Sequence, residues 1–219
     1  MRDIEIIYDD NFFTLCVKPT DVLSQQDNKG SLNMPELLEE QLNTPYKAVH
    51  RLDYGVGGIM VYAKNDFCAS NLSEQIRDHT FEKEYLAVVC GTPPEKEGVL
   101  QDLLFKDSSK NKTFVVDKLR KGVKKASLEY KVLDTKTTEK GVFSLVWIKL
   151  HTGRTHQIRV QFSSRQLSLY GDGKYGNKYN SKFIALWSHK LTFKHPKTKD
   201  KVCYSSLPED CFPWNIFKM

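Results

Sequence analysis

The chain has 219 residues and a formal net charge of +6, and 40% of its residues are hydrophobic. This hydrophobic share is enough for a packed core, so the composition excludes a mainly disordered chain. No apolar run approaches the roughly 20 residues of a membrane-spanning helix, and the acidic start MRDIEIIYDD lacks the hydrophobic region of a signal peptide. The 5 cysteines are scattered without a CxxC pair. This pattern indicates free thiols, no zinc cluster and a cytoplasmic protein.

The charge is divided unevenly along the chain. Residues 1–105 carry 9 Lys or Arg and 18 Asp or Glu, a net charge of −9, whereas residues 106–219 carry 24 and 9, a net charge of +15. Within the second part, residues 106–125 hold 8 basic and 2 acidic side chains. Such asymmetry indicates a nucleic-acid or anionic-surface partner, although a solvated lysine-rich face explains the charge equally well.

Hydrophobic patterning predicts a strand-rich chain with few helices. In chain order, the predicted strands are 4–8, 12–18, 59–63, 84–90, 113–116, 127–133, 142–150, 183–193 and 201–205. Helices are predicted at 35–42, with a proline near the start, and at 65–78, with Asn65 or Asp66 as the N-cap. Residues 157–162 are ambiguous, since they alternate like a strand but follow Thr155, a possible helix cap.

These elements favour an α+β fold with a mixed, largely antiparallel central sheet flanked by helices and loops. No composition shift marks a linker, so we expect residues 1–219 to form a single domain.

The sequence HRLDYGVGG at residues 50–58 is the first candidate site. Asp53 lies beside His50 and Arg51, so its carboxylate is either a nucleophile or base, or one partner of a local ion pair. The glycines allow the backbone to approach another group closely. A glycine-rich loop whose charges solvate each other is the simpler interpretation.

The sequence LHTGRTHQIR at residues 150–159 is the second candidate. Arg154 and Arg159 are suited to phosphate or carboxylate recognition. His151 and His156 are five residues apart, which does not fit a helical zinc site, so we expect no metal. A polar cap between a strand and a helix is the structural alternative.

Two tyrosine-bearing segments complete the candidates. Tyr85 alternates with apolar residues and is typical of a core tyrosine with its hydroxyl at a sheet edge. The segment YGDGKYG at residues 170–176 predicts a tight turn, and its tyrosines either stack on a base or pack internally. Dinucleotide, phosphate-loop and nucleophile-elbow motifs are absent from the sequence. The residues alone therefore do not define the reaction.

Taken together, the segments resemble the RluA family of pseudouridine synthases. Residues 50–53 resemble the family's HRLD signature, 83–91 its KxYxAxVxG strand, 152–159 its TGRTHQIR segment and 171–176 its GDxxYG turn. The motifs occur in the family's order and spacing, and Val17-Lys18-Pro19 fits its usual start. Any one motif is weak, whereas four in order are a strong signal.

The resemblance implies an RNA isomerase that converts uridine to pseudouridine without a metal or other cofactor. It implies that Asp53 attacks the uridine, at C6 of uracil or at the ribose C1′, or assists a glycal route. Tyr85 is expected to stack on the uracil, and Arg159 to pair with the catalytic carboxylate. The substrate-binding residues are expected to be Arg51, His50, Arg154, His156 and Gln157, the last three as structural or phosphate contacts.

The sequence departs from the family in two places. Val56-Gly57 replaces the usual Thr-Ser, and Gln166-Leu167-Ser168 replaces a common GHP. An RNA-binding or RNA-folding protein with weak or lost catalysis is therefore the alternative to an active enzyme. A glycoside hydrolase is a weaker alternative still, because this activity needs a second acid near Asp53. Asp172 is the candidate for that acid. We expect structured ribosomal or transfer RNA as the partner, no membrane, a monomer and no separate N-terminal RNA-binding domain.

Overall fold

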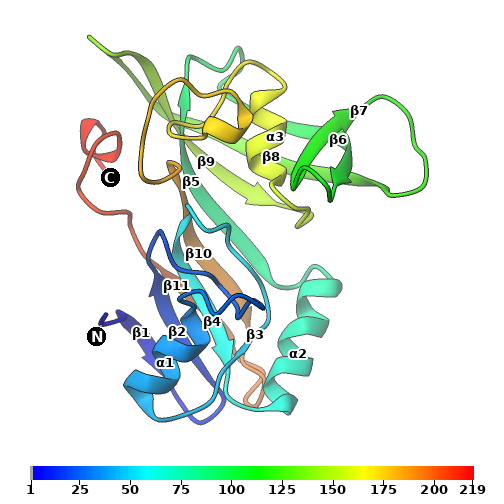
Figure 1. The fold of residues 1–219 in the computed structure, drawn as a ribbon, viewed down its shortest axis with the longest axis vertical. Coiled ribbons are helices and arrows are strands. Elements are labelled where there is room, and N and C mark those ends of the chain that lie inside the picture. Colours follow the sequence, from blue (N-terminus) through cyan, green and yellow to red (C-terminus); the bar gives the residue numbers. More distant parts are fainter. Residues whose placement is uncertain (1) are drawn as a thin grey trace. The chain divides into compact units, whose positions relative to one another are not determined.

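A computed structural model describes residues 2–219, and the chain divides into two compact units. The first unit comprises the residues up to Lys83 together with Trp187–Pro208. The second takes Glu84–Leu186 together with Glu209–Met219. The strands of both units are labelled in Figure 1 and are described below unit by unit.

The strands of the first unit have the order β1-β2-β4-β10, with β3 paired to β4 and β11 paired to β10. All these pairs are antiparallel except β4 with β10, which is parallel. The strands are β1 (Ile6–Asp9), β2 (Phe13–Lys18), β3 (Lys47–Ala48), β4 (Gly57–Ala63), β10 (Leu186–Lys194) and β11 (Lys201–Ser205).

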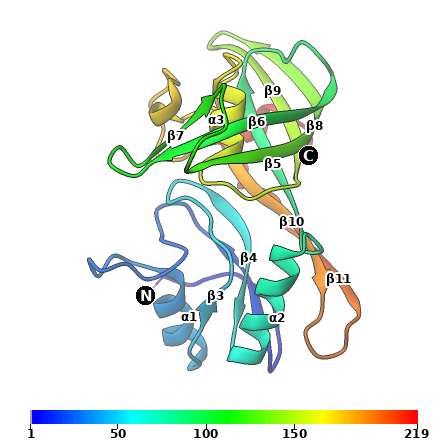
Figure 2. The ribbon, with the colours of Figure 1, turned by 90° about the vertical axis from the view of Figure 1, so that its right-hand side faces the viewer.

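Two helices belong to this unit, α1 (Met34–Leu42) and α2 (Asp66–Arg77). Each begins after an asparagine whose side chain accepts a backbone N–H, from Glu36 for α1 and from Cys68 for α2. Figures 1 and 2 show both helices beside the sheet. The apolar face of α2 joins the core of the unit, which contains Phe13, Leu15, Ile59, Val61, Ala63, Cys68, Leu72, Phe81, Leu191 and Phe193.

The strands of the second unit pair antiparallel in the order β5-β9-β8-β6-β7. Its strands are β5 (Glu82–Cys90), β6 (Glu97–Asp107), β7 (Lys112–Val116), β8 (Val123–Thr138) and β9 (Gly141–Leu150). Helix α3 (Gln157–Ser163) packs against β6, β7 and the 3-10 turn η1 (Gly173–Tyr175). A second 3-10 turn, η2 (Trp214–Ile216), lies near the C-terminal end. In both ribbon views, the loops around β6 and β7 extend away from the rest of this unit.

The α+β class with a mixed, largely antiparallel sheet is confirmed, as are the two helices and Asn65 as an N-cap. Strand β6 was missed, because LQDLLF mixes polar and apolar residues without clean alternation. Residues 157–163 form a helix, so the strand alternative was wrong. The Thr155 cap was also wrong: the N-cap is His156, whose φ of 54° is left-handed and whose side chain makes no cap hydrogen bond. None of the helices within residues 2–219 is long and apolar enough to cross a membrane.

All five cysteines are free. Cys16 is buried in β2, whereas Cys90 at the end of β5 is only half-buried. Among residues 2–219, no three His, Cys, Asp or Glu side chains are grouped so that they could hold a metal ion.

Candidate functional site

Asp53 of the first unit lies in a turn that leads into β4. Its carbonyl accepts a hydrogen bond from the Val56 N–H at 3.0 Å, which closes a four-residue turn. The preceding residue, Leu52, is fixed on both sides: its N–H donates to the Ser24 Oγ at 2.9 Å, and its carbonyl accepts from the same hydroxyl at 2.7 Å. Ser24 is buried. The Asp53 carboxylate therefore starts from a backbone that packing and hydrogen bonds hold in place.

The glycines of this loop are required by β10. A Cβ on Gly57 would lie 2.5 Å from Cζ3 of the buried Trp187, and Gly58 has a φ of 120° and lies against the backbone of Ser188. The expectation of a close backbone approach is therefore confirmed. At Gly57, where the family usually has a serine, the Trp187 ring occupies the space that the serine Cβ would need.

We predict that Gly57→Ser lowers the free energy of unfolding by about 1–3 kcal/mol, because the indole must move or the strand must shift. Urea unfolding measures this loss. Gly173→Ala serves as the control, since a Cβ there meets nothing within 4 Å and its φ is not left-handed. A Gly57→Ser variant as stable as the control would show that Trp187 does not restrict this position.

His50 is an internal anchor of the loop. Its side chain is buried, Nε2 accepts the Val61 N–H at 3.2 Å, and its ring lies 5.7 Å from that of Phe81. Burial, assisted by the charge of Lys83, lowers the pKa of His50 to about 3, so the imidazole is neutral at physiological pH. Nδ1 has no hydrogen-bond partner among the described residues. This geometry ties the HRLD segment to β4.

Arg51 has the opposite environment. It is exposed, and within residues 2–219 its guanidinium forms no ion pair. An exposed, unneutralised arginine next to Asp53 is suited to a phosphate oxygen.

Lys18 is a residue of this region to which the sequence assigned no role. It is fully buried at the end of β2, and its Nζ donates to the carbonyls of Pro19 and Val22 at 2.8 and 2.7 Å. Burial lowers the pKa of Lys18 to about 8, and the carboxylates of Asp21 and Asp53 oppose that shift. The only sequence signal was the Val17-Lys18-Pro19 triplet.

The lowered pKa of Lys18 predicts a pH dependence of stability. Between about pH 8 and 10.5 the unfolded chain holds a proton on Lys18 that the folded protein has released, so stability rises with pH in this window. We expect the unfolding free energy of the wild type to rise by up to about 3 kcal/mol relative to Lys18→Met across this window. Parallel denaturant titrations of both proteins measure the difference. A difference that stays constant with pH would contradict the prediction.

In the second unit, Tyr85 on β5 is buried opposite Ile148 of β9. Arg159 on α3 is also buried, and its guanidinium forms a bidentate ion pair with Asp172: Nε donates to Oδ2 at 2.7 Å and Nη2 to Oδ1 at 2.8 Å. Asp172 is 1% exposed. The pairing joins the third motif to the fourth and was not foreseen.

Tyr175 lies beside this ion pair. Its ring centre is 5.1 Å from the Arg159 guanidinium carbon and 5.1 Å from the Lys112 Nζ. Its hydroxyl accepts the Thr113 N–H at 2.8 Å and is bonded to the His156 Nδ1 at 2.9 Å. Tyr175 is buried, so of the two roles considered for it, internal packing is confirmed.

The remaining predicted residues shape the loop before α3. Gln157 is buried; its Oε1 accepts from the Arg154 N–H and the Thr152 hydroxyl at 3.0 and 2.8 Å, and its Nε2 donates to the Ser127 carbonyl at 3.1 Å. Arg154 is exposed, and its Nε donates to the Lys125 carbonyl at 3.0 Å. Gln157 therefore holds the loop, while Arg154 presents its charge at the surface.

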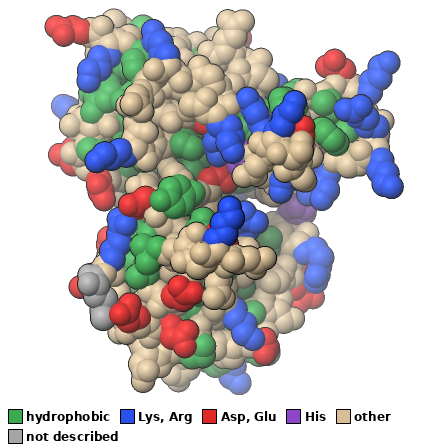
Figure 3. All heavy atoms as spheres, in the orientation of Figure 1, with side chains coloured by type: hydrophobic (Ala, Val, Ile, Leu, Met, Phe, Trp, Pro, Cys, Tyr) green, Lys and Arg blue, Asp and Glu red, His purple; other side chains and the backbone are tan. Residues whose placement is uncertain are grey.

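The basic segment 106–125 runs from the end of β6 through β7 to the start of β8. Figure 3 shows Lys and Arg side chains gathered over the β6–β7 region. Among the described residues, none of its eight basic side chains forms an ion pair, and only Lys112 is half-buried. The charge of this surface is therefore not neutralised by neighbouring acids.

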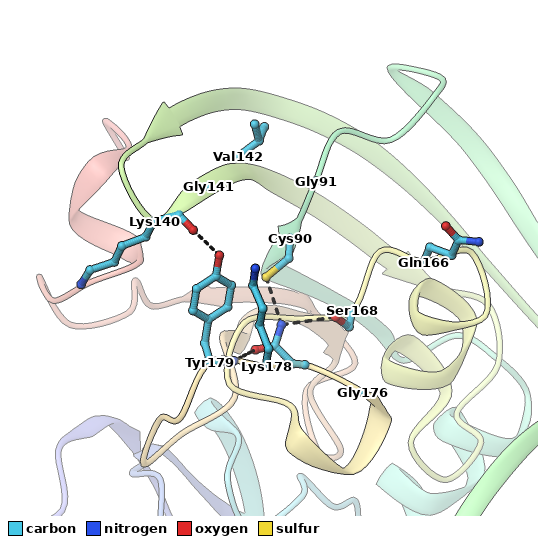
Figure 4. Close-up of a pocket in the computed structure, with 11 residues that line it drawn as sticks. Cys90, Gly91, Lys140, Gly141, Val142, Gln166, Ser168, Gly176, Lys178 and Tyr179 are labelled. Atoms are coloured by element: carbon cyan, nitrogen blue, oxygen red, sulfur yellow. Dashed lines mark hydrogen bonds between the residues drawn. The ribbon is translucent and has the colours of Figure 1, made fainter.

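A pocket of about 340 Å³ opens in the second unit between the ends of β5 and β9 and the loop 166–179 (Figure 4). Asn177 lines the pocket: its side chain donates to the Cys90 Sγ and the Ser168 Oγ and accepts from the N–H groups of Gly171 and Tyr179. These bonds occupy the amide completely, so it fastens the loop to β5.

Comparison with known proteins agrees with the fold and the motifs. Residues 13–164 match the family described as RNA pseudouridylate synthase. Over 210 residues the chain is 31% identical to the ribosomal large subunit pseudouridine synthase C of Buchnera aphidicola, covering 90% of this chain and 64% of that protein. It is 29% identical to the tRNA pseudouridine synthase C of Haemophilus ducreyi, covering 94% of this chain and 91% of that protein. A solved structure, human RNA pseudouridylate synthase domain containing 1, superposes with a TM-score of 0.81 at 21% identity, covering 96% of this chain and 85% of that one.

The fold and the matched residues define the class: the chain belongs to the RNA pseudouridylate synthase family. The relatives' names include ribosomal large subunit pseudouridine synthases C and D, which confirms the resemblance to the RluA family. The chain spans just under two thirds of the Buchnera relative's length. The matched range contains Asp53, Tyr85 and Arg159.

Proposed function

We propose that this protein is an RNA pseudouridine synthase that isomerises a uridine of structured ribosomal or transfer RNA. The observation that carries the proposal is the match of residues 13–164 to the family, with an aspartate, a tyrosine and an arginine at the positions implied by the motifs. The names of the relatives include both a ribosomal and a transfer RNA pseudouridine synthase, which supports these two RNA classes as substrates. We further propose that the chain acts in the cytoplasm as a monomer, with both units forming one catalytic domain.

In the proposed reaction, Asp53 supplies the carboxylate that attacks the uridine or assists a glycal route. The bond between uracil N1 and ribose C1′ breaks, the uracil rotates, and a bond between C5 and C1′ forms while C5 loses its proton and N1 gains one. Tyr85 stacks on the uracil, and Arg159 fixes the direction of the catalytic carboxylate. Because a stacked base cannot be reached, the uridine must first be flipped out.

The residues around these three have supporting roles. We propose that Arg51 and Arg154, both exposed, bind RNA phosphates. His50, His156 and Gln157, which are engaged by internal hydrogen bonds, keep the two loops in shape for the substrate.

The experiment that tests the proposal maps pseudouridine across total RNA from cells with and without the gene. Purified protein is then added to the affected RNA carrying tritium at C5 of uridine, and tritium release is measured. Loss of one or more sites in the deletion strain, with tritium release in vitro, is expected. Tight RNA binding with no pseudouridine in any RNA would favour the RNA-folding alternative.

Asp172 is not suited to be the second acid that a glycoside hydrolase would need. Both carboxylate oxygens of Asp172 accept hydrogen bonds from Arg159, in a buried pair. An acid engaged in this way cannot act as a free proton donor to a glycosidic oxygen.

The unpaired charges of residues 106–125 predict strong, salt-dependent RNA binding. Replacing Lys118, Arg120, Lys121, Lys124 and Lys125 together by glutamine is expected to weaken RNA binding by at least about tenfold at 0.1 M salt and to flatten the salt dependence. Filter binding at several salt concentrations measures both effects. As a control, five exposed lysines elsewhere, Lys29, Lys47, Lys197, Lys199 and Lys201, are replaced in the same way. Equal RNA affinities for the two variants would show that the segment is an ordinary solvated surface without a special role in RNA binding.

A further inference from the structure

Tyr54 occupies the corner of the turn that carries Asp53. The hydrogen bond from the Val56 N–H to the Asp53 carbonyl makes Tyr54 the first of the two central residues of a β-turn, a position whose side chain projects outward. The Tyr54 side chain is accordingly 56% exposed. An aromatic ring is thus displayed at the residue directly after the proposed catalytic carboxylate.

The turn holds this ring on a fixed backbone. The Tyr54 carbonyl accepts the Asp21 N–H at 3.0 Å, which ties the corner to the loop after β2. Leu52 is held by Ser24, and Gly58 lies against Ser188 of β10. A ring presented on a preorganised backbone loses little conformational entropy when it binds a partner.

The exposure of Tyr54 is unusual in this protein. Among the described residues only one other aromatic side chain, Phe67 at 54%, is more than half exposed. Phe67 has partners: its ring lies edge-on to Phe12 at 6.5 Å, and the Lys199 Nζ is 6.0 Å from its centre. Within residues 2–219, Tyr54 makes neither a ring contact nor a side-chain hydrogen bond.

We infer that Tyr54 is a substrate-binding residue whose ring stacks on a base that flanks the target uridine in the RNA. The inference rests on the proposed function. Flipping a uridine out uncovers the face of a neighbouring base, and an aromatic ring next to the attacking carboxylate can cover it. Exposed Arg51, on the other side of Asp53, would hold the backbone of the same segment. Since stacking is stronger on larger bases, Tyr54 favours a purine at the flanking position.

The test uses an RNA hairpin that contains the uridine mapped in cells, with 2-aminopurine at one flanking position. Stacking on an aromatic ring or loss of neighbouring stacking changes the fluorescence of 2-aminopurine, so Tyr54→Ala should differ from both the wild type and Tyr54→Phe. We expect Tyr54→Ala to lose the wild-type signal and to raise the Kd for the RNA roughly tenfold. Tyr54→Phe should retain both the signal and the affinity, because the ring and not the hydroxyl makes the contact.

Phe67→Ala is the matched control, since it removes an equally exposed ring from the same unit, and it should leave signal and affinity unchanged. Thermal unfolding of each variant verifies the fold. A Tyr54→Ala protein with wild-type Kd and fluorescence would overturn the stacking role, and so would a Tyr54→Phe protein as impaired as Tyr54→Ala. In either case, tritium release by the wild type would still support the proposed function. If the wild type itself releases no tritium from any RNA, the proposed function fails, and that result does not depend on Tyr54.

Discussion

Asp53→Asn and Asp53→Ala are expected to lower pseudouridine formation by at least about 10⁴-fold, the scale of loss seen when the attacking group of a covalent mechanism is removed. The amide of Asn has nearly the same shape as the carboxylate but neither its charge nor its nucleophilicity. Single-turnover tritium release from C5-labelled RNA measures the rate. Because Asp53 is only half-buried and its turn is held by backbone bonds, we expect the thermal unfolding transition to stay cooperative.

RNA binding by the same variants separates loss of chemistry from loss of binding. The contacts proposed for Arg51, Arg154 and residues 106–125 do not involve the Asp53 carboxylate, so Kd should change by less than about threefold. A variant that keeps more than a tenth of the wild-type rate would contradict the role of Asp53. Loss of the cooperative transition would instead show that the carboxylate is needed for folding.

The sequence predicted the elements whose local signals are strong. Alternating β-branched and aromatic residues identified most of β2, β5 and β9, and Asn65 identified the start of α2. Strand β6 was missed because its pairing with β7 and β8, rather than its own pattern, makes it a strand. Helix α3 begins at a left-handed histidine, which no cap preference predicts; the bond from His156 to the Tyr175 hydroxyl accompanies that conformation.

The sequence predicted the candidate site as a set of motifs, but it did not predict which residues contact one another in the fold. The sequence indicated that Gly57 and Gly58 allow a close approach, but not that Trp187 and Ser188 provide it, because those residues lie some 130 positions later. The same holds for Lys18, whose burial depends on the loop carbonyls around it. Contacts of this kind arise from tertiary packing, which a local pattern does not encode.

The ion pair between Arg159 and Asp172 carries the largest expected effect on stability. Both side chains are almost fully buried and are joined by two hydrogen bonds. Removing one partner of a buried pair leaves the other charge without full compensation, which typically costs 3–5 kcal/mol. We therefore expect Asp172→Ala to lower the free energy of unfolding by about 3 kcal/mol, as measured by urea denaturation of the full chain.

The matched control is Asp66→Ala, which removes the carboxylate of the exposed pair between Lys47 and Asp66. Exposed pairs contribute about 0–1 kcal/mol, so this variant should unfold close to the wild type. Asp172→Asn tests the cause, because it keeps the size and one acceptor oxygen but removes the charge, and it should fall between Asp172→Ala and the wild type. If Asp172→Ala is no less stable than Asp66→Ala, the pair does not stabilise the turn at residues 171–176, and Arg159 must be held by its other neighbours, Tyr175 among them.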